Sequence, residues 1–106
     1  MIVDNYPISD GTMIVKISGE ISGIKSIDAI HEKLNSAMDS DRVYLDLSEV
    51  DFTGSVFINI LINFSKKHKE RLGKFYILNP SSVATDILDI MNLDKVLNII
   101  HSSRDN

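Results

Sequence analysis

The stretch DFTGSVF, residues 51–57, joins an apolar strand-like segment to an apolar helix-like segment. Before it, residues 42–48 alternate between apolar and polar side chains, which is the pattern of a strand with one buried face. After it, residues 55–72 carry apolar side chains at helical spacing, and Gly73 is well placed to end that helix. Ser55 therefore stands at a strand-to-helix joint, where a serine can be a helix cap, a nucleophile or a position for a phosphate.

The same two patterns alternate through the rest of the chain. Alternating apolar residues predict strands over residues 2–8, 12–18, 42–48, 74–80 and 96–100, the first of them at an edge because it contains Pro7. Apolar residues three or four apart predict two further helices. The inner stripe of the first helix is Ile24, Ile27, Ile30, Leu34 and Met38. The third helix, capped by Ser81 or Ser82, has the inner stripe Val83, Ile87, Leu88 and Met91.

This order of elements predicts an α/β fold in one domain. Crossover helices set neighbouring strands parallel, whereas the first two strands look like a hairpin. We therefore expect a four- or five-stranded mixed β-sheet with helices packed mainly on one face. The length of 106 residues suits a single domain, which we assign to residues 1–100, followed by a polar tail over residues 101–106.

Composition narrows the range of partners. A net charge of −4 argues against a nucleic-acid partner, which would need a basic surface. The basic run at residues 66–71 lies where the second helix ends, and there it complements the negative end of the helix dipole. The apolar run at residues 56–64 is too short to cross a bilayer, and the N-terminus lacks the basic start of a signal peptide. These features predict a bacterial-type cytoplasmic domain with no membrane insertion.

No catalytic set of residues assembles in the sequence. The chain has no cysteine, and His31, His68 and His101 are isolated, so we expect each to be a solvated side chain and not a metal ligand. A phosphate-binding glycine-lysine loop is absent, and Ser55 lacks the flanking glycines of a nucleophile elbow. We therefore expect no enzymatic activity, no cofactor and no metal.

The second helix is apolar around nearly its whole circumference. Its first ten residues include Val56, Phe57, Ile58, Ile60, Leu61, Ile62 and Phe64. Two interpretations stay open: the helix is wedged between neighbours and buried on several sides, or some of these side chains form an exposed docking surface beside Ser55. From the second we expect at least two of Val56, Phe57, Ile58 and Ile62 to be exposed.

Residues 43–61, VYLDLSEVDFTGSVFINIL, resemble the signature region of STAS domains, the anti-sigma-factor antagonist family. That region usually reads v-LDLS-x-V-x-F-x-D-S-S-G-L-x-x-L. The matching residues are Leu45, Asp46, Leu47, Ser48, Val50 and Phe52, without a gap, which places Ser55 on the phosphorylated serine of the family. GEIS at residues 19–22 is similar to the G-E-L-D turn of the family, and residues 73–99 are similar to its C-terminal strand, helix and last strand.

The departures from the family pattern lie around the serine. Gly54 replaces the acid that precedes it, Val56 replaces a second small hydroxyl residue, and Phe57 replaces a glycine. Ser22 replaces the aspartate of the G-E-L-D turn, although Glu20 is kept. The usual terminal helix after the last strand is missing or very short.

The resemblance implies a partner-switching module that binds an anti-sigma factor, often a serine kinase, and is released when Ser55 is phosphorylated. The partner-binding residues that it implies are Glu20, Ser22, Thr53, Gly54, Ser55, Val56, Phe57, Ile58 and Ile62. A structural STAS subunit, scaffolding a stressosome-like regulatory or a transport complex without phosphorylation, remains the alternative. A homodimer is a further candidate assembly. In every case Ser55 can also serve as a helix cap, which contributes ~1 kcal/mol of stability.

Overall fold

The computed structural model describes residues 2–52 and 54–101, without the side chains of Phe52 and Ser55. The elements in chain order are β1 (Ile2–Ser9), β2 (Thr12–Glu20), α1 (Gly23–Ala37), β3 (Arg42–Phe52), α2 (Ser55–Glu70), β4 (Lys74–Leu78), α3 (Ser82–Ile90), the 3-10 helix η1 (Leu93–Lys95) and β5 (Asn98–Ile100). Of the expected polar tail over residues 101–106, His101 is described and exposed, whereas residues 102–106, and with them the question of a terminal helix, lie outside the described residues.

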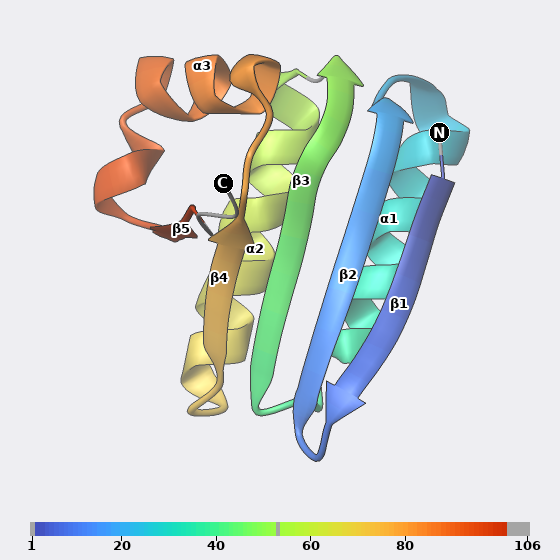
Figure 1. Ribbon diagram of the computed structural model, residues 1–106, viewed down its shortest axis with the longest axis vertical. Helices are drawn as coiled ribbons and strands as arrows, with labels where there is room; N and C mark the ends of the chain where they lie inside the picture. Colours follow the sequence, from blue (N-terminus) through green and yellow to red (C-terminus); the bar gives the residue numbers. More distant parts are fainter. Residues whose placement is uncertain (1, 53, 102–106) are drawn as a thin grey trace.

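The five strands form one mixed sheet in the order β1-β2-β3-β4-β5. β1 is antiparallel to β2, and every later neighbouring pair is parallel. Helices α1 and α2 lie behind the sheet, and α3 lies near the end where β3 finishes (Figure 1). The predicted fold class is confirmed: a mixed sheet whose helices pack mainly on one face.

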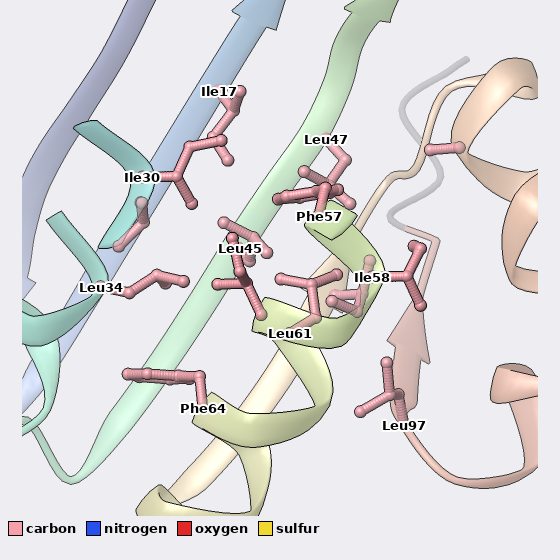
Figure 2. Close-up of a cluster of buried hydrophobic side chains, with 14 of the residues drawn as sticks. Ile17, Ile30, Leu34, Leu45, Leu47, Phe57, Ile58, Leu61, Phe64 and Leu97 are labelled. Atoms are coloured by element: carbon pink, nitrogen blue, oxygen red, sulfur yellow. The ribbon is translucent and has the colours of Figure 1, made fainter. Parts of the chain in front are cut away.

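The core lies between the inner face of the sheet and the two helices behind it. Figure 2 shows Ile17, Leu45 and Leu47 from the strands meeting Leu34 of α1 and Leu61 of α2. All five side chains are buried. Burying a side chain of this size contributes about 1.5–3 kcal/mol, so the inner face of the sheet supplies much of the driving force for folding.

Two of the predicted helix stripes need correction. Ile24 is exposed and not part of the core, because at about 100° per residue it lies roughly 120° around α1 from the buried Ile30. In α3 the buried positions are Ala84 and Leu88, whereas Met91 lies beyond the helix and is exposed. The cap expected at Ser81 or Ser82 is Ser81, whose Oγ accepts a hydrogen bond of 3.2 Å from the Ala84 N–H.

The C-terminal end of α2 differs from the prediction in two respects: the residue at which the helix ends and the residue that ends it. The helix ends at Glu70, and it is Leu72, not Gly73, that adopts the left-handed conformation, with a φ of 63°. The Gly73 N–H donates to the His68 carbonyl and the Leu72 N–H to the Lys69 carbonyl, which is the Schellman pattern. A side chain on Gly73 would overlap the ring of His68, so glycine serves close packing at this position.

His68 was expected to be solvated, and that prediction is wrong. Its side chain is fully buried and stacks on Phe64, with ring centroids 5.4 Å apart. Its Nε2 lies 2.6 Å from the Ser40 carbonyl oxygen, which can only accept, so Nε2–H is the donor. The physical reason is helical spacing, since His68 continues the buried stripe of Phe57, Leu61 and Phe64 along α2.

Candidate functional site

Two helix starts meet at one edge of the sheet. β2 and β3 are parallel neighbours, so their carboxyl ends lie together, and Glu20 pairs with Phe52 in the ladder. The chain leaves β2 through Ser22 into α1 and leaves β3 through Gly54 into α2. The fold therefore brings together the two segments that carry most of the predicted partner-binding residues.

A groove of about 510 Å³ lies between these two helix starts. Its lining consists of Ile21, Ser22, Gly23, Ile24, Ile27, Gly54, Val56 and Phe57. Ile24 and Val56 are 80% and 59% exposed, although both are aliphatic. The groove is therefore an apolar depression in which two large side chains, one from each helix, remain open to solvent.

Neither helix start carries a side-chain cap. Gly54 has no side chain to offer, and the Ser22 hydroxyl donates to Glu20 Oε2 at 2.9 Å instead of accepting from α1. Neither first turn contains an acidic residue. The N–H groups of a first helical turn lack intrahelical partners, and the helix dipole makes this end positive. Both termini at the groove can therefore stabilise an anion.

The polar residues of the site are few. Among the residues that the structure describes, no group of three or more histidine, aspartate or glutamate side chains could hold a metal ion. Glu20 is exposed, and its hydrogen bond from Ser22 fixes one carboxylate beside the mouth of the groove. The site provides an apolar contact surface and two positive helix ends, and these features suit the binding of another molecule.

The prediction that at least two of four named side chains of the second helix are exposed is wrong. Of the four side chains named for it, only Val56 is exposed; Phe57 and Ile58 are 1% and 2% exposed, and Ile62 is half-buried. The reason is that α2 is the central helix: Figure 2 shows Phe57 beside Leu47 and Ile58 facing Leu97 near β5. The apolar circumference of α2 is thus used inside the domain, as the wedged-helix interpretation held.

The remaining predicted residues have mixed positions. Gly54 and Ser22 line the groove, and Glu20 lies next to it through Ser22. Ser55 is the first residue of α2, but its side chain, like the whole of Thr53, lies outside the described residues. Ile24 was missed, because its spacing assigned it to the inner stripe of α1. The sequence did hold one signal for its exposure: Ile24 directly follows Gly23 in the first turn of the helix and lies at the flank of that stripe.

Comparison with known proteins places the chain in a family. The family model of the STAS domain matches residues 5–106. No curated protein sequence matches the chain. Within the described residues, no helix has the length and apolar character to cross a membrane.

Solved structures agree on the fold. The anti-sigma factor antagonist SpoIIAA in its unphosphorylated form superposes with a TM-score of 0.83 at 13% identity, covering 97% of this chain and 90% of that one. The phosphorylated form of SpoIIAA from Bacillus gives 0.78 at 13% identity, with 97% and 93% covered. A serine-to-glutamate variant of RsbS from Moorella thermoacetica gives 0.75 at 16% identity, with 94% and 86% covered.

The family match spans nearly the whole chain, and the mixed sheet with its two convergent helix starts is the fold of these structures. The chain belongs to the STAS domain family.

Proposed function

We propose that this chain is an anti-sigma-factor-antagonist-like partner-switching module, which binds an anti-sigma factor or serine kinase through the groove between α1 and α2. Phosphorylation of Ser55 opposes that binding. The observation that carries the proposal is the pair of exposed aliphatic residues, Ile24 and Val56, in a groove where two uncapped helices begin. The domain acts in the cytoplasm, by binding and without catalysis or a cofactor.

The groove suits a protein partner. Large aliphatic side chains that stay exposed beside a depression usually mark a contact surface. Ile24 and Val56 belong to different helices, so a partner side chain inserted between them would contact both. A few well-packed residues that become fully buried usually supply most of the affinity of an interface.

Ser55 is placed where a phosphate would affect binding more than folding. A phosphate adds about −1.5 to −2 charges at neutral pH. As the first residue of α2, Ser55 starts a helix whose N–H groups and dipole stabilise negative charge, so the domain tolerates the modification. A partner that covers Val56 would have to desolvate the neighbouring dianion, so its affinity falls.

Gly54 changes the electrostatics of this switch. Where typical family members carry an acid before the serine, Gly54 leaves a phosphate on Ser55 without an adjacent like charge. A Cβ at Gly54 would meet nothing within 4 Å, so an aspartate there is sterically allowed. In this proposal the missing acid affects recognition by the kinase and not the fold.

A constitutive scaffold is the second candidate function. Two departures from the family pattern favour it. Gly54 and Ser22 stand where typical members carry the acids that accompany the phosphorylated serine. In that case the groove binds a subunit of a stressosome-like or transport complex permanently, and Ser55 is only the first residue of α2, after the N-cap Gly54.

The test begins with a pull-down from the native organism and identification of the partner by mass spectrometry. Wild type, Ser55→Ala and Ser55→Asp are then titrated against that partner. The switch predicts that Ser55→Asp binds much more weakly than the other two and that the cognate kinase with ATP labels wild type but not Ser55→Ala. Equal binding by both variants, with no label on wild type, would favour the scaffold.

A matched pair of variants separates the groove from general surface hydrophobicity. Val56→Asp places a charge in the groove, whereas Val96→Asp makes the same change at a 69% exposed position outside it. We expect Val56→Asp to weaken partner binding at least about tenfold and Val96→Asp to leave it unchanged. Equal effects of the two changes would place the contact elsewhere.

A further inference from the structure

The outer face of the sheet, opposite the core, has no helix over it among the described residues (Figure 1). Side chains alternate between the two faces of a strand, so the residues between the buried Val43, Leu45 and Leu47 of β3 point to this outer face. They are Tyr44 and Asp46, and the pairing register extends their rows across the neighbouring strands.

One of these rows gathers every tyrosine of the chain. Tyr6 pairs with Ile14, Ile14 with Tyr44, and Tyr44 with Tyr76, so the three tyrosines and one isoleucine cross four strands side by side. The rings of Tyr44 and Tyr76 are stacked, with centroids 5.0 Å apart. Tyr6 is exposed and the other three are half-buried. We call Tyr6, Ile14, Tyr44 and Tyr76 the tyrosine row.

Opposite charges lie on the two sides of this row. On β3, Arg42 comes two residues before Tyr44 and Asp46 two residues after it, on the same face. At about 3.3 Å per residue they are roughly 13 Å apart, too far to pair with each other. Within the described part of the chain, Arg42 forms no ion pair.

Lys16 is the cation next to Asp46 in the strand register, but it already forms an ion pair with another acid. Lys16 Nζ lies 3.1 Å from Glu49 Oε2, and this hydrogen bond to Glu49 raises the pKa of Lys16 above its usual value. On β3, the charged residues two positions to either side of Tyr44, Arg42 and Asp46, are therefore both left without an ion pair among the described residues.

We infer that the tyrosine row is the centre of a symmetric dimer interface, in which Arg42 of each protomer lies against Asp46 of the partner subunit. The two sheets pack face to face, with the two-fold axis along the tyrosine row. Such an axis reverses the strand direction, so the residue two positions before Tyr44 faces the residue two positions after it in the other copy. The same surface patch serves both copies, as a two-fold interface requires.

The size of the face fits a second copy. The strands β1, β2, β3 and β4 have 8, 9, 11 and 5 residues, so at about 3.3 Å per residue and about 4.8 Å between strands they present roughly 500 Å² of flat area. Two such faces give about 1,000 Å², the area that a specific interface should reach. A single-stranded nucleic acid could also stack on tyrosines, but the net charge of −4 and the acids Asp4, Asp46 and Glu49 oppose it.

The dimer goes beyond the proposed function. None of the groove residues belongs to the tyrosine row, and Ile24 and Val56 lie on helices that start at the edge of the sheet. A dimer formed through the outer face would therefore leave two grooves open, one on each protomer.

Charge reversal in the full-length chain tests the inference by sedimentation equilibrium over a dilution series. Wild type should reach twice the monomer mass, and Arg42→Glu and Asp46→Arg should each weaken association about tenfold or more, because each change creates two like-charge contacts per dimer. The double variant should restore wild-type association. An equimolar mixture of the two single variants should form heterodimers, since both of their charge pairs are then complementary.

The control is Lys66→Glu, which changes net charge as much as Arg42→Glu at an exposed position on α2. It should associate like wild type, and circular dichroism should show that all variants fold. A wild type that stays monomeric over the series, or a double variant as weak as the single ones, overturns the inference. So does binding of an oligothymidine by monomeric wild type that is lost on Tyr44→Ala.

Discussion

The two ends of α2 differ in how many of their groups are already satisfied within the domain. At the C-terminal end, His68 donates to the Ser40 carbonyl, and the N–H groups of Leu72 and Gly73 donate back to the last turn. At the N-terminal end, Gly54 supplies no side-chain cap, and Val56 remains exposed beside the groove. One helix therefore has a closed end that holds the fold together and an open end that, in the proposed function, contacts the partner.

The difference has a physical cause in the backbone. Each helix end leaves four polar groups without intrahelical partners. At the closed end a Schellman pattern satisfies carbonyls, and Lys67 and Lys69 complement the negative dipole. At the open end no described side chain caps the helix by accepting a hydrogen bond from its free N–H groups. Substitutions should therefore affect stability at the closed end and binding at the open end.

The largest difference should come from truncating one side chain at each end. His68→Ala removes a fully buried ring and leaves the Ser40 carbonyl unpaired, so it should lower the free energy of unfolding by about 2–4 kcal/mol. Val56→Ala removes an exposed side chain and should cost less than about 0.5 kcal/mol. Urea unfolding followed by circular dichroism measures both. Similar losses for the two variants would remove the distinction between the ends.

A smaller effect is expected from adding one methyl group at each end. Gly73→Ala would push a methyl into the His68 ring, which its bond to Ser40 and its stacking on Phe64 hold in place. We expect a loss of about 1–3 kcal/mol, typical of overpacking. At Gly54 the methyl meets open space, and Gly54→Ala should stay within about 0.5 kcal/mol of wild type. A stable Gly73→Ala variant in the same urea series would show that the His68 ring can move.

The smallest expected effect comes from adding an acid at each end. Gly54→Asp supplies a cap and a negative charge at the positive end of the helix, which should stabilise the domain by about 0.3–1 kcal/mol. Lys69→Asp places the same charge at the negative end and should destabilise it by a similar amount. Both effects should shrink in high salt, which thermal melts at two ionic strengths would detect. Effects of the same sign would contradict the electrostatic contrast.

Much of the fold follows from the sequence, because alternation and helical spacing are local signals. The mixed sheet, its antiparallel first strand and the cap at Ser81 are confirmed. β3 continues to Phe52, four residues beyond the expected end, because its ladder with β2 keeps the chain extended there. No local pattern shows how far a neighbouring strand extends.

The candidate site was less predictable, since exposure depends on what packs against a helix. At least two of Val56, Phe57, Ile58 and Ile62 were expected to be exposed, but α2 lies in the middle of the helical layer and only Val56 is. His68 could have been assigned to the core from its spacing to Leu61 and Phe64. The tyrosine row could not have been recognised, because it depends on the register of four strands.

The central claim is that the open end of α2 is the binding end. Its most direct test is an amide NMR titration of the isotope-labelled chain with the partner captured from the native organism. We predict that the signals of Gly23, Ile24, Gly54 and Val56 shift or broaden first, whereas those of Leu72 and Gly73 stay unchanged. Shifts centred on Leu72 and Gly73, with the groove signals unmoved, would contradict the account.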